Sequence, residues 1–240
     1  MLIASAKKCL LILLLTAISL PLFADGPRID KVYDPYVHFQ EHEVEYRGLF
    51  QQDDDPSLNG MKLHKLGYGT SITERLFTEV YFIGSNREDD GVKLDATEVE
   101  LKWQLTEQGQ YSNDWGLLFE LERENDFDHW EAASTLIMLH EWNRWVATAN
   151  LSVLYEWGDQ TQSEWETAFS GQFRYRYIES LEPAIEFYQA QDTQGIGPVL
   201  TGLVRFGQTG KLYWRTGVIL GLDKTTPESS WVLNLEYEFR

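Results

Sequence analysis

The feature that most constrains this chain is an alternation of apolar and polar residues that recurs along almost its whole length. In residues 230–239 (SWVLNLEYEF), Trp231, Leu233 and Leu235 fall on one face, and Asn234 and Glu236 fall on the other. Side chains that alternate in this way lie on opposite faces of a β-strand. About twelve such segments follow one another, each close to the ~10 residues that a tilted strand needs to cross a bilayer.

The segments expected as strands cover residues 42–50, 61–72, 76–85, 97–105, 115–122, 130–142, 145–157, 165–178, 181–190, 198–207, 211–222 and 230–239. Short turns alternate with longer, mostly acidic loops between them. This alternation is typical of an up-and-down barrel with two unlike ends. The expected fold is therefore an all-β, antiparallel transmembrane barrel over residues 41–240. An even number of strands places both of its termini at the short-turn end.

Residues 1–24 have the pattern of a secretory signal peptide. Lys7 and Lys8 precede an apolar run, and the small residue Ala24 marks the expected cleavage point. An uncleaved membrane helix is the alternative. The only cysteine, Cys9, would leave with the signal peptide, so no disulfide framework is expected. Residues 25–40 contain two prolines and show no clear alternation, which predicts a periplasmic lead-in segment.

The charge of the chain excludes one class of partner. Its 38 acidic residues outnumber its 20 basic residues, two of which lie in the signal peptide. Such a protein repels phosphate backbones, so we expect no nucleic acid as a partner. A chain with 43% hydrophobic residues also buries too much apolar surface to stay disordered.

The tryptophans support a membrane barrel, because membrane barrels carry an aromatic girdle at each interface. Those expected at the long-loop end are Trp130, Trp157, Trp165 and Trp231, and those expected toward the short-turn end are Trp103, Trp115, Trp142, Trp145 and Trp214. None lies in the middle of an expected strand. The apolar faces are therefore assigned to lipid and the charged faces to the interior. A soluble lipocalin-like barrel and a periplasmic β-sandwich are the alternatives.

Together these features resemble a Gram-negative outer-membrane β-barrel. In that class an aromatic residue usually ends the last strand and acts as the assembly signal, a role that the resemblance gives to Phe239 although Arg240 follows it. In size the chain is similar to small twelve-stranded porins for acidic oligosaccharides, nucleoside channels and putative transporters linked to aromatic-compound degradation. The resemblance implies an outer-membrane location, a monomer, and outer-membrane lipids, small solutes and the barrel-assembly machinery as partners.

The charges on the inward faces are the candidate functional residues. They are Arg47, Arg174, Arg176, Arg205, Lys211, Arg215, Glu98, Glu100, Glu182 and Glu186. One hypothesis is a water-filled lumen that selects solutes by charge. The other is a ladder of cross-strand ion pairs, with Arg176 opposite Glu182 and Arg174 diagonal to it. Arg205, Lys211 and Arg215 are candidates for a basic track.

No metal, cofactor or catalytic site is expected. His38 and His42 are four residues apart, but the extended chain there would separate them. The acidic run Asp53–Asp55 lacks the spacing of a calcium loop. Ser134 and His140 share a strand face, yet six residues place them about 20 Å apart. The sequence therefore favours a non-enzymatic channel for passive diffusion of small polar or charged solutes. The alternatives are a closed structural or interaction barrel and, third, a lipid-acting barrel enzyme.

Overall fold

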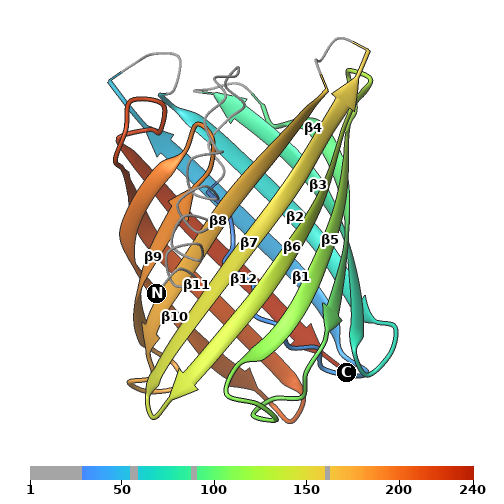
Figure 1. Ribbon diagram of the computed structural model, residues 1–240, viewed down its shortest axis with the longest axis vertical. Helices are drawn as coiled ribbons and strands as arrows, with labels where there is room; N and C mark the ends of the chain where they lie inside the picture. Colours follow the sequence, from blue (N-terminus) through green and yellow to red (C-terminus); the bar gives the residue numbers. More distant parts are fainter. Residues whose placement is uncertain (1–28, 55–58, 88–90, 160–162) are drawn as a thin grey trace, which may run out of the picture.

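The computed structural model describes residues 29–54, 59–87, 91–159 and 163–240, so the expected signal peptide, residues 1–24, lies outside the described residues. The described part contains twelve strands (Figure 1): β1 (His42–Gln52), β2 (Met61–Ser71), β3 (Leu76–Arg87), β4 (Lys93–Gln104), β5 (Asp114–Glu124), β6 (His129–Trp142), β7 (Trp145–Gly158), β8 (Glu164–Tyr175), β9 (Glu182–Gln189), β10 (Gln194–Phe206), β11 (Gly210–Gly221) and β12 (Ser229–Phe239). In these residues no helix is both long and apolar enough to cross a membrane.

The strands form one closed antiparallel barrel in which each strand pairs with its neighbours in the sequence. The barrel closes where β1 pairs with β12, in a register that runs from His42 opposite Phe239 to Gln52 opposite Ser229. Closure leaves no sheet edge with unpaired backbone groups. The expected twelve-stranded up-and-down barrel is therefore confirmed.

The two faces of each strand differ as the sequence predicts. On the outer face Val44, Val80 and Leu235 are exposed, whereas the inward Glu45 is completely buried. On β12, Val232 and Asn234 point inward and are buried, and Trp231 points outward. The apolar surface thus faces away from the barrel interior, and the charged side chains face into it.

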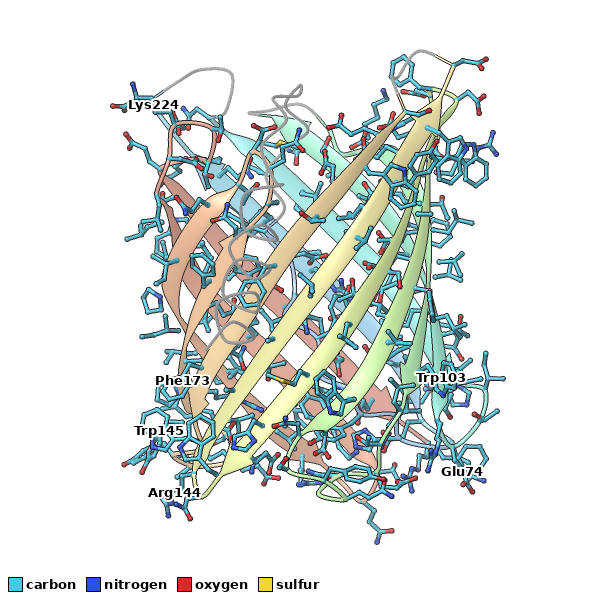
Figure 2. All side chains as sticks on the ribbon, in the orientation of Figure 1. Glu74, Trp103, Arg144, Trp145, Phe173 and Lys224 are labelled. Atoms are coloured by element: carbon cyan, nitrogen blue, oxygen red, sulfur yellow. The ribbon has the colours of Figure 1, made fainter. Side chains whose placement is uncertain are left out.

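The two ends of the barrel are also unlike (Figure 1). One end carries the loop around Lys224, and the other end carries the tight β6–β7 hairpin at Arg144 together with one long connection, residues 105–113 between β4 and β5 (Figure 2). Trp103 and Trp145 lie close to the short-turn end (Figure 2). The β6–β7 hairpin is closed by Asn143, whose φ of 56° suits the left-handed conformation that Asn tolerates in tight turns.

β10 begins four residues earlier than expected. Its first half contains Gly195, Gly197 and Pro198, which disfavour a strand from sequence alone. In the barrel, Gly197 is needed because a Cβ at this position would lie 1.8 Å from the backbone oxygen of Val218. The close approach of the β10 and β11 backbones therefore accounts for the glycine at this position. The local sequence pattern does not reveal that contact.

The outward position of Leu235 gives a stability prediction. Replacing Leu235 with Arg should cost ~2–4 kcal/mol of folding free energy in a bilayer, because a charged side chain would then face lipid near mid-depth. The measurement is urea unfolding of the refolded barrel in lipid vesicles.

Glu228→Arg, on an exposed loop at the barrel end, is the matched control and should cost little. Equal stability of Leu235→Arg and the native chain would reverse the assignment of inside and outside.

Candidate functional site

Residues 29–40, named here the inner segment, run through the barrel interior instead of lying as a lead-in beyond its end. Ile29 packs against Leu49, Tyr188 and Ile219 of the barrel wall, and Val37 is also buried. The chain then reverses at Gln40, which has a φ of 64°, and enters β1. The segment therefore descends beside the strand that follows it, and it occupies part of the lumen.

Tyr33 fixes the middle of the inner segment. Its backbone N–H donates to Asn150 Oδ1 at 2.8 Å, and Asn150 Nδ2 donates to the Tyr33 carbonyl at 2.9 Å. Its hydroxyl donates to Glu100 Oε1 at 2.8 Å, and its ring packs against Leu118 and Ile137. A single side chain, Asn150, thus satisfies both backbone groups of a residue that could not otherwise be buried without cost.

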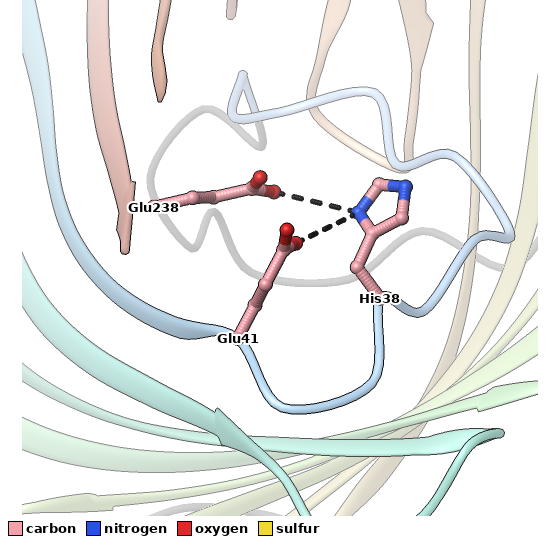
Figure 3. A group of neighbouring side chains, drawn as sticks. All are labelled: His38, Glu41 and Glu238. Carbon is pink, nitrogen blue, oxygen red and sulfur yellow. Dashed lines mark ion pairs between the residues drawn. The ribbon is translucent and has the colours of Figure 1, made fainter. Parts of the chain in front are cut away.

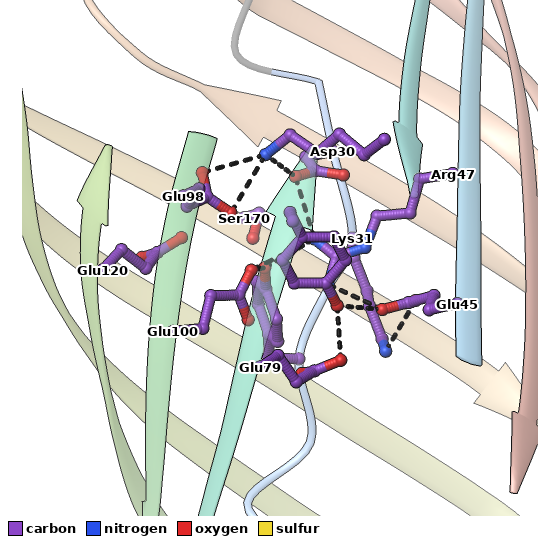
Figure 4. A network of polar contacts seen from close by, with 12 residues as sticks. Asp30, Lys31, Glu45, Arg47, Glu79, Glu98, Glu100, Glu120 and Ser170 are labelled. Carbon is purple, nitrogen blue, oxygen red and sulfur yellow. Dashed lines mark hydrogen bonds and ion pairs between the residues drawn. The ribbon is translucent and has the colours of Figure 1, made fainter. Parts of the chain in front are cut away.

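Two charged residues of the inner segment complete ion pairs with the wall (Figure 4). Asp30 lies 3.1 Å from both Arg47 Nη1 and Lys65 Nζ. Lys31 Nζ lies 2.9 Å from Glu45 and 2.5 Å from Glu236. Because the segment brings one charge of each sign, it neutralises wall charges on β1, β2 and β12 that would otherwise be buried with fewer partners.

Tyr81 joins this network from β3. Its hydroxyl donates to Glu79 Oε1 at 2.6 Å and accepts a hydrogen bond from Arg47 Nη2 at 2.7 Å. The ring lies flat against Gly67 of β2, where a Cβ would lie 2.3 Å from a ring carbon. Gly67 therefore makes room for a tyrosine that holds Arg47 in place.

Each cation proposed from the sequence has a carboxylate partner. The pairs are Arg47 with Glu45 at 2.9 Å, Arg174 with Glu182 at 2.7 Å, Arg176 with Glu141 at 2.9 Å, Arg205 with Glu179 at 2.6 Å, Lys211 with Glu41 at 2.8 Å and Glu238 at 2.9 Å, and Arg215 with Glu186 at 2.8 Å. The expectation that Arg176 pairs with Glu182 is wrong, because β8 ends at Tyr175 and the Arg176 side chain reaches β6 instead.

These partners argue against the expected basic track. The Arg205 side chain is exposed to solvent, where it pairs with Glu179. Arg215 is buried, so the two arginines do not form one surface. Arg215 donates to Glu186, to the Tyr188 hydroxyl and to the Asp30 carbonyl. The cations of β8, β10 and β11 therefore take part in local ion pairs and do not form a continuous positive surface.

Beside the ion pairs lies a cavity of about 370 Å³, named here the vestibule. It extends from the long-loop ends of the strands, at Glu124 and His129, to mid-barrel, where Asp30 and Tyr33 of the inner segment line it. The carboxylates that line it are Asp30, Glu98, Glu120, Glu122, Glu124, Glu131 and Glu156. Its lining ammonium groups are Lys31 and Lys65. The vestibule is therefore strongly acidic.

The candidate glutamates lie in different surroundings. Glu98 borders the vestibule and pairs with Lys65 at 3.2 Å. Glu100 lies behind it and accepts the hydrogen bond from Tyr33. Glu182 and Glu186 belong to the ion pairs of the opposite wall. The structure thus brings together Glu98 and Glu100 but separates them from the other two.

His38 lies at the short-turn end between two buried carboxylates (Figure 3). Its Nδ1 is 3.2 Å from Glu41 and 3.6 Å from Glu238. Lys211 already lies between the same two carboxylates, so a cationic side chain takes the place that a metal would need. His42 instead meets the Tyr68 hydroxyl at 2.9 Å, so the two histidines have separate partners.

Sequence reasoning missed the residues of the inner segment and their main partners, namely Asp30, Lys31, Tyr33, Tyr81 and Asn150. The inner segment has no alternation, so no pattern placed it inside the barrel. One signal was present, because Asn150 lies on the inward face of β7, and an amide side chain needs hydrogen-bond partners when it is buried.

Asn150→Ala tests the anchor of the inner segment. The variant should weaken the docking of residues 29–37 by about 1–3 kcal/mol, because both backbone groups of Tyr33 lose their partner. Amide hydrogen exchange should then become faster in this segment and stay slow in the strands. Asn125→Ala, in an exposed loop, is the control. Unchanged exchange at Tyr33 would contradict this role of Asn150.

His38 gives a pH prediction. The neighbouring carboxylate of Glu238 raises the pKa of His38 above the usual value, and the charge of Glu41 acts in the same direction. The charged imidazole should stabilise the fold fully below pH ~6.5, and this contribution should be lost as the pH rises through the raised pKa.

The measurement is urea unfolding of the native chain and His38→Gln over a pH series. The native chain should be the more stable at low pH, and the two should converge at high pH. The effect should be small, because His38 is 49% exposed. A difference that grows with pH would contradict the assignment.

The fold was compared with known proteins. No protein-family model and no curated protein matches the sequence. Among solved structures, the COG4313 outer membrane channel from Pseudomonas putida F1 aligns with a TM-score of 0.57 and 14% identity, covering 88% of this chain and 99% of that one. The NanC porin aligns with a TM-score of 0.52 and 8% identity, covering 82% and 99%.

The KdgM porin in complex with disordered oligogalacturonate aligns with a TM-score of 0.50 and 11% identity, covering 82% of this chain and 98% of that chain. The identities are low, so these likenesses concern the fold. The chain has the architecture of the small twelve-stranded outer-membrane porins and channels that its sequence resembles.

Proposed function

We propose that the chain is an outer-membrane channel through which small polar or charged solutes pass by diffusion, with the inner segment narrowing its lumen. The observation that carries this proposal is the acidic vestibule inside a barrel whose outer face is apolar. A barrel of this kind presents its apolar band to lipid and a polar interior to water. The fold likeness to outer-membrane channels and porins supports the same function.

The proposal includes the assignments made from the sequence. The signal peptide would direct export, Phe239 would act as the assembly signal, and the outward tryptophans would form girdles at the two lipid interfaces. Their clustering supports the last point. Trp130 stacks on Trp157, and Trp145 stacks on Phe173. The charges on the inward faces would set which solutes enter.

A closed structural barrel is the second candidate, and the inner segment favours it. Ion pairs of Asp30 and Lys31 hold this segment against β1, and Tyr33 binds Asn150 of β7. A lipid-acting enzyme on the outer wall has less support. His140 Nδ1 lies 2.6 Å from the Ser112 carbonyl and 2.8 Å from Asn113 Oδ1, so its hydrogen bonds go to a turn and not to Ser134.

Conductance of the refolded mature chain in a planar bilayer distinguishes the first two candidates. We expect steady single-channel steps from the native chain and larger steps after deletion of residues 29–37, because the deletion would widen the lumen at mid-barrel. Migration on a gel before and after boiling would verify that each variant is folded.

A folded and inserted barrel that stays silent in both forms would favour the closed structural barrel. Equal conductance in both forms would show that the inner segment does not lie in the conducting path.

A further inference from the structure

The charges of the vestibule are unequally distributed around the barrel. Its carboxylates come mainly from β4, β5, β6 and β7, and its two ammonium groups come from the inner segment and β2. Seven carboxylates face two ammonium groups in the lining. A cleft lined by one sign of charge concentrates ions of the opposite sign.

The two ammonium groups do little to offset this excess. Lys31 is bound to Glu45 and Glu236, which do not line the vestibule. Lys65 lies between Glu98 and Asp30, and Asp30 also pairs with Arg47. The lining therefore has more carboxylates than ammonium groups, and most of the carboxylates lie on β5, β6 and β7.

Three carboxylates converge at the inner end of the vestibule. Glu98, Glu100 and Glu120 each offer an oxygen, and these three oxygens lie within 4.8 Å of one another. Figure 4 shows them on neighbouring strands beside the inner segment. Ca²⁺ binds oxygen ligands at 2.3–2.6 Å, so oxygens at this spacing can contact one ion without a backbone movement.

Glu100 supplies a second, independent observation about this group. The side chain is 1% exposed. Its Oε1 accepts the Tyr33 hydroxyl and lies 3.5 Å from Arg47 Nη1, whereas its Oε2 is buried and has no hydrogen-bond donor in the described part of the chain. A buried carboxylate oxygen without a partner is costly, and a bound cation would satisfy it.

We propose that Glu98, Glu100 and Glu120 bind a hard divalent cation such as Ca²⁺ at the floor of the vestibule, and that the vestibule above them admits cationic solutes in preference to anionic ones. The preference for cationic solutes deepens the proposed channel function and rests on it. The cation site itself does not depend on whether the barrel is open or closed. Hard dications favour such all-oxygen sites over nitrogen or sulfur ligands.

The primary test is calorimetric titration of the refolded full barrel with CaCl₂ alone. Glu120→Gln removes one charge from the site, and its amide oxygen can still accept the hydrogen bond from Thr135. We expect Ca²⁺ affinity to fall by at least about tenfold in this variant, since the charge removed lies next to the ion.

Asp54→Asn is the matched control, because it removes one acidic charge from an exposed loop at the same end of the barrel. Its affinity should equal that of the native chain. Absence of Ca²⁺ binding, or equal affinity in Glu120→Gln and the native chain, would overturn the site.

A second measurement addresses solute charge. In a KCl gradient, the reversal potential of the channel should show cation preference, and Glu120→Gln should reduce it more than Asp54→Asn does. An anion-selective channel would overturn the second half of the inference while leaving the channel function intact. An inserted barrel that conducts no current, but whose Ca²⁺ affinity depends on Glu120, would support the cation site and reject the channel function.

Discussion

The pairing of β1 with β12 is the constraint on which the rest of the structure depends. A sheet whose outer face is apolar can lie in lipid only if every backbone group is bonded within it, and closure of the barrel achieves this. The register at this seam, with Glu45 opposite Glu236 and Arg47 opposite Asn234, also decides which charges meet inside. Closure and interior chemistry are therefore set together.

The interior then has to accommodate buried charges. An unpaired ion in such a place is costly, and a paired ion is tolerated when its other hydrogen bonds are also made. Arg47 illustrates the solution, since it contacts Glu45, Asp30 and the hydroxyls of Tyr33 and Tyr81. Asp30 and Tyr33 belong to the inner segment, so the wall and the segment stabilise each other.

The two sides of the lumen differ in the charged side chains that they carry. The side formed by β8 to β12 and by β1 and β2 carries arginines and lysines, each with its carboxylates. The side from β4 to β7 carries mainly glutamates and borders the vestibule. This asymmetry separates a wall rich in ion pairs from a wall rich in carboxylates, and the candidate cation site lies where the two meet, beside Tyr33.

The sequence by itself determined the strands, their faces and the two unlike ends of the barrel. These follow from a two-residue period and from turn composition, which are local properties, and residues such as Leu235 and Glu236 report them directly. It also identified inward charges such as Arg174 and Glu182 as partners. Pairing across a single hairpin is predictable, because the turn fixes the register.

Only the tertiary structure decided where residues 29–40 lie, which carboxylate Arg176 meets and which glutamates converge. These depend on the closed register and on a segment without periodicity, so residues far apart in sequence, such as Tyr33 and Asn150, become neighbours. The partner of Arg176 changed from Glu182 to Glu141 because β8 ends one residue before it. Alternation tells which residues enter a barrel, but the closed geometry decides which of them meet there.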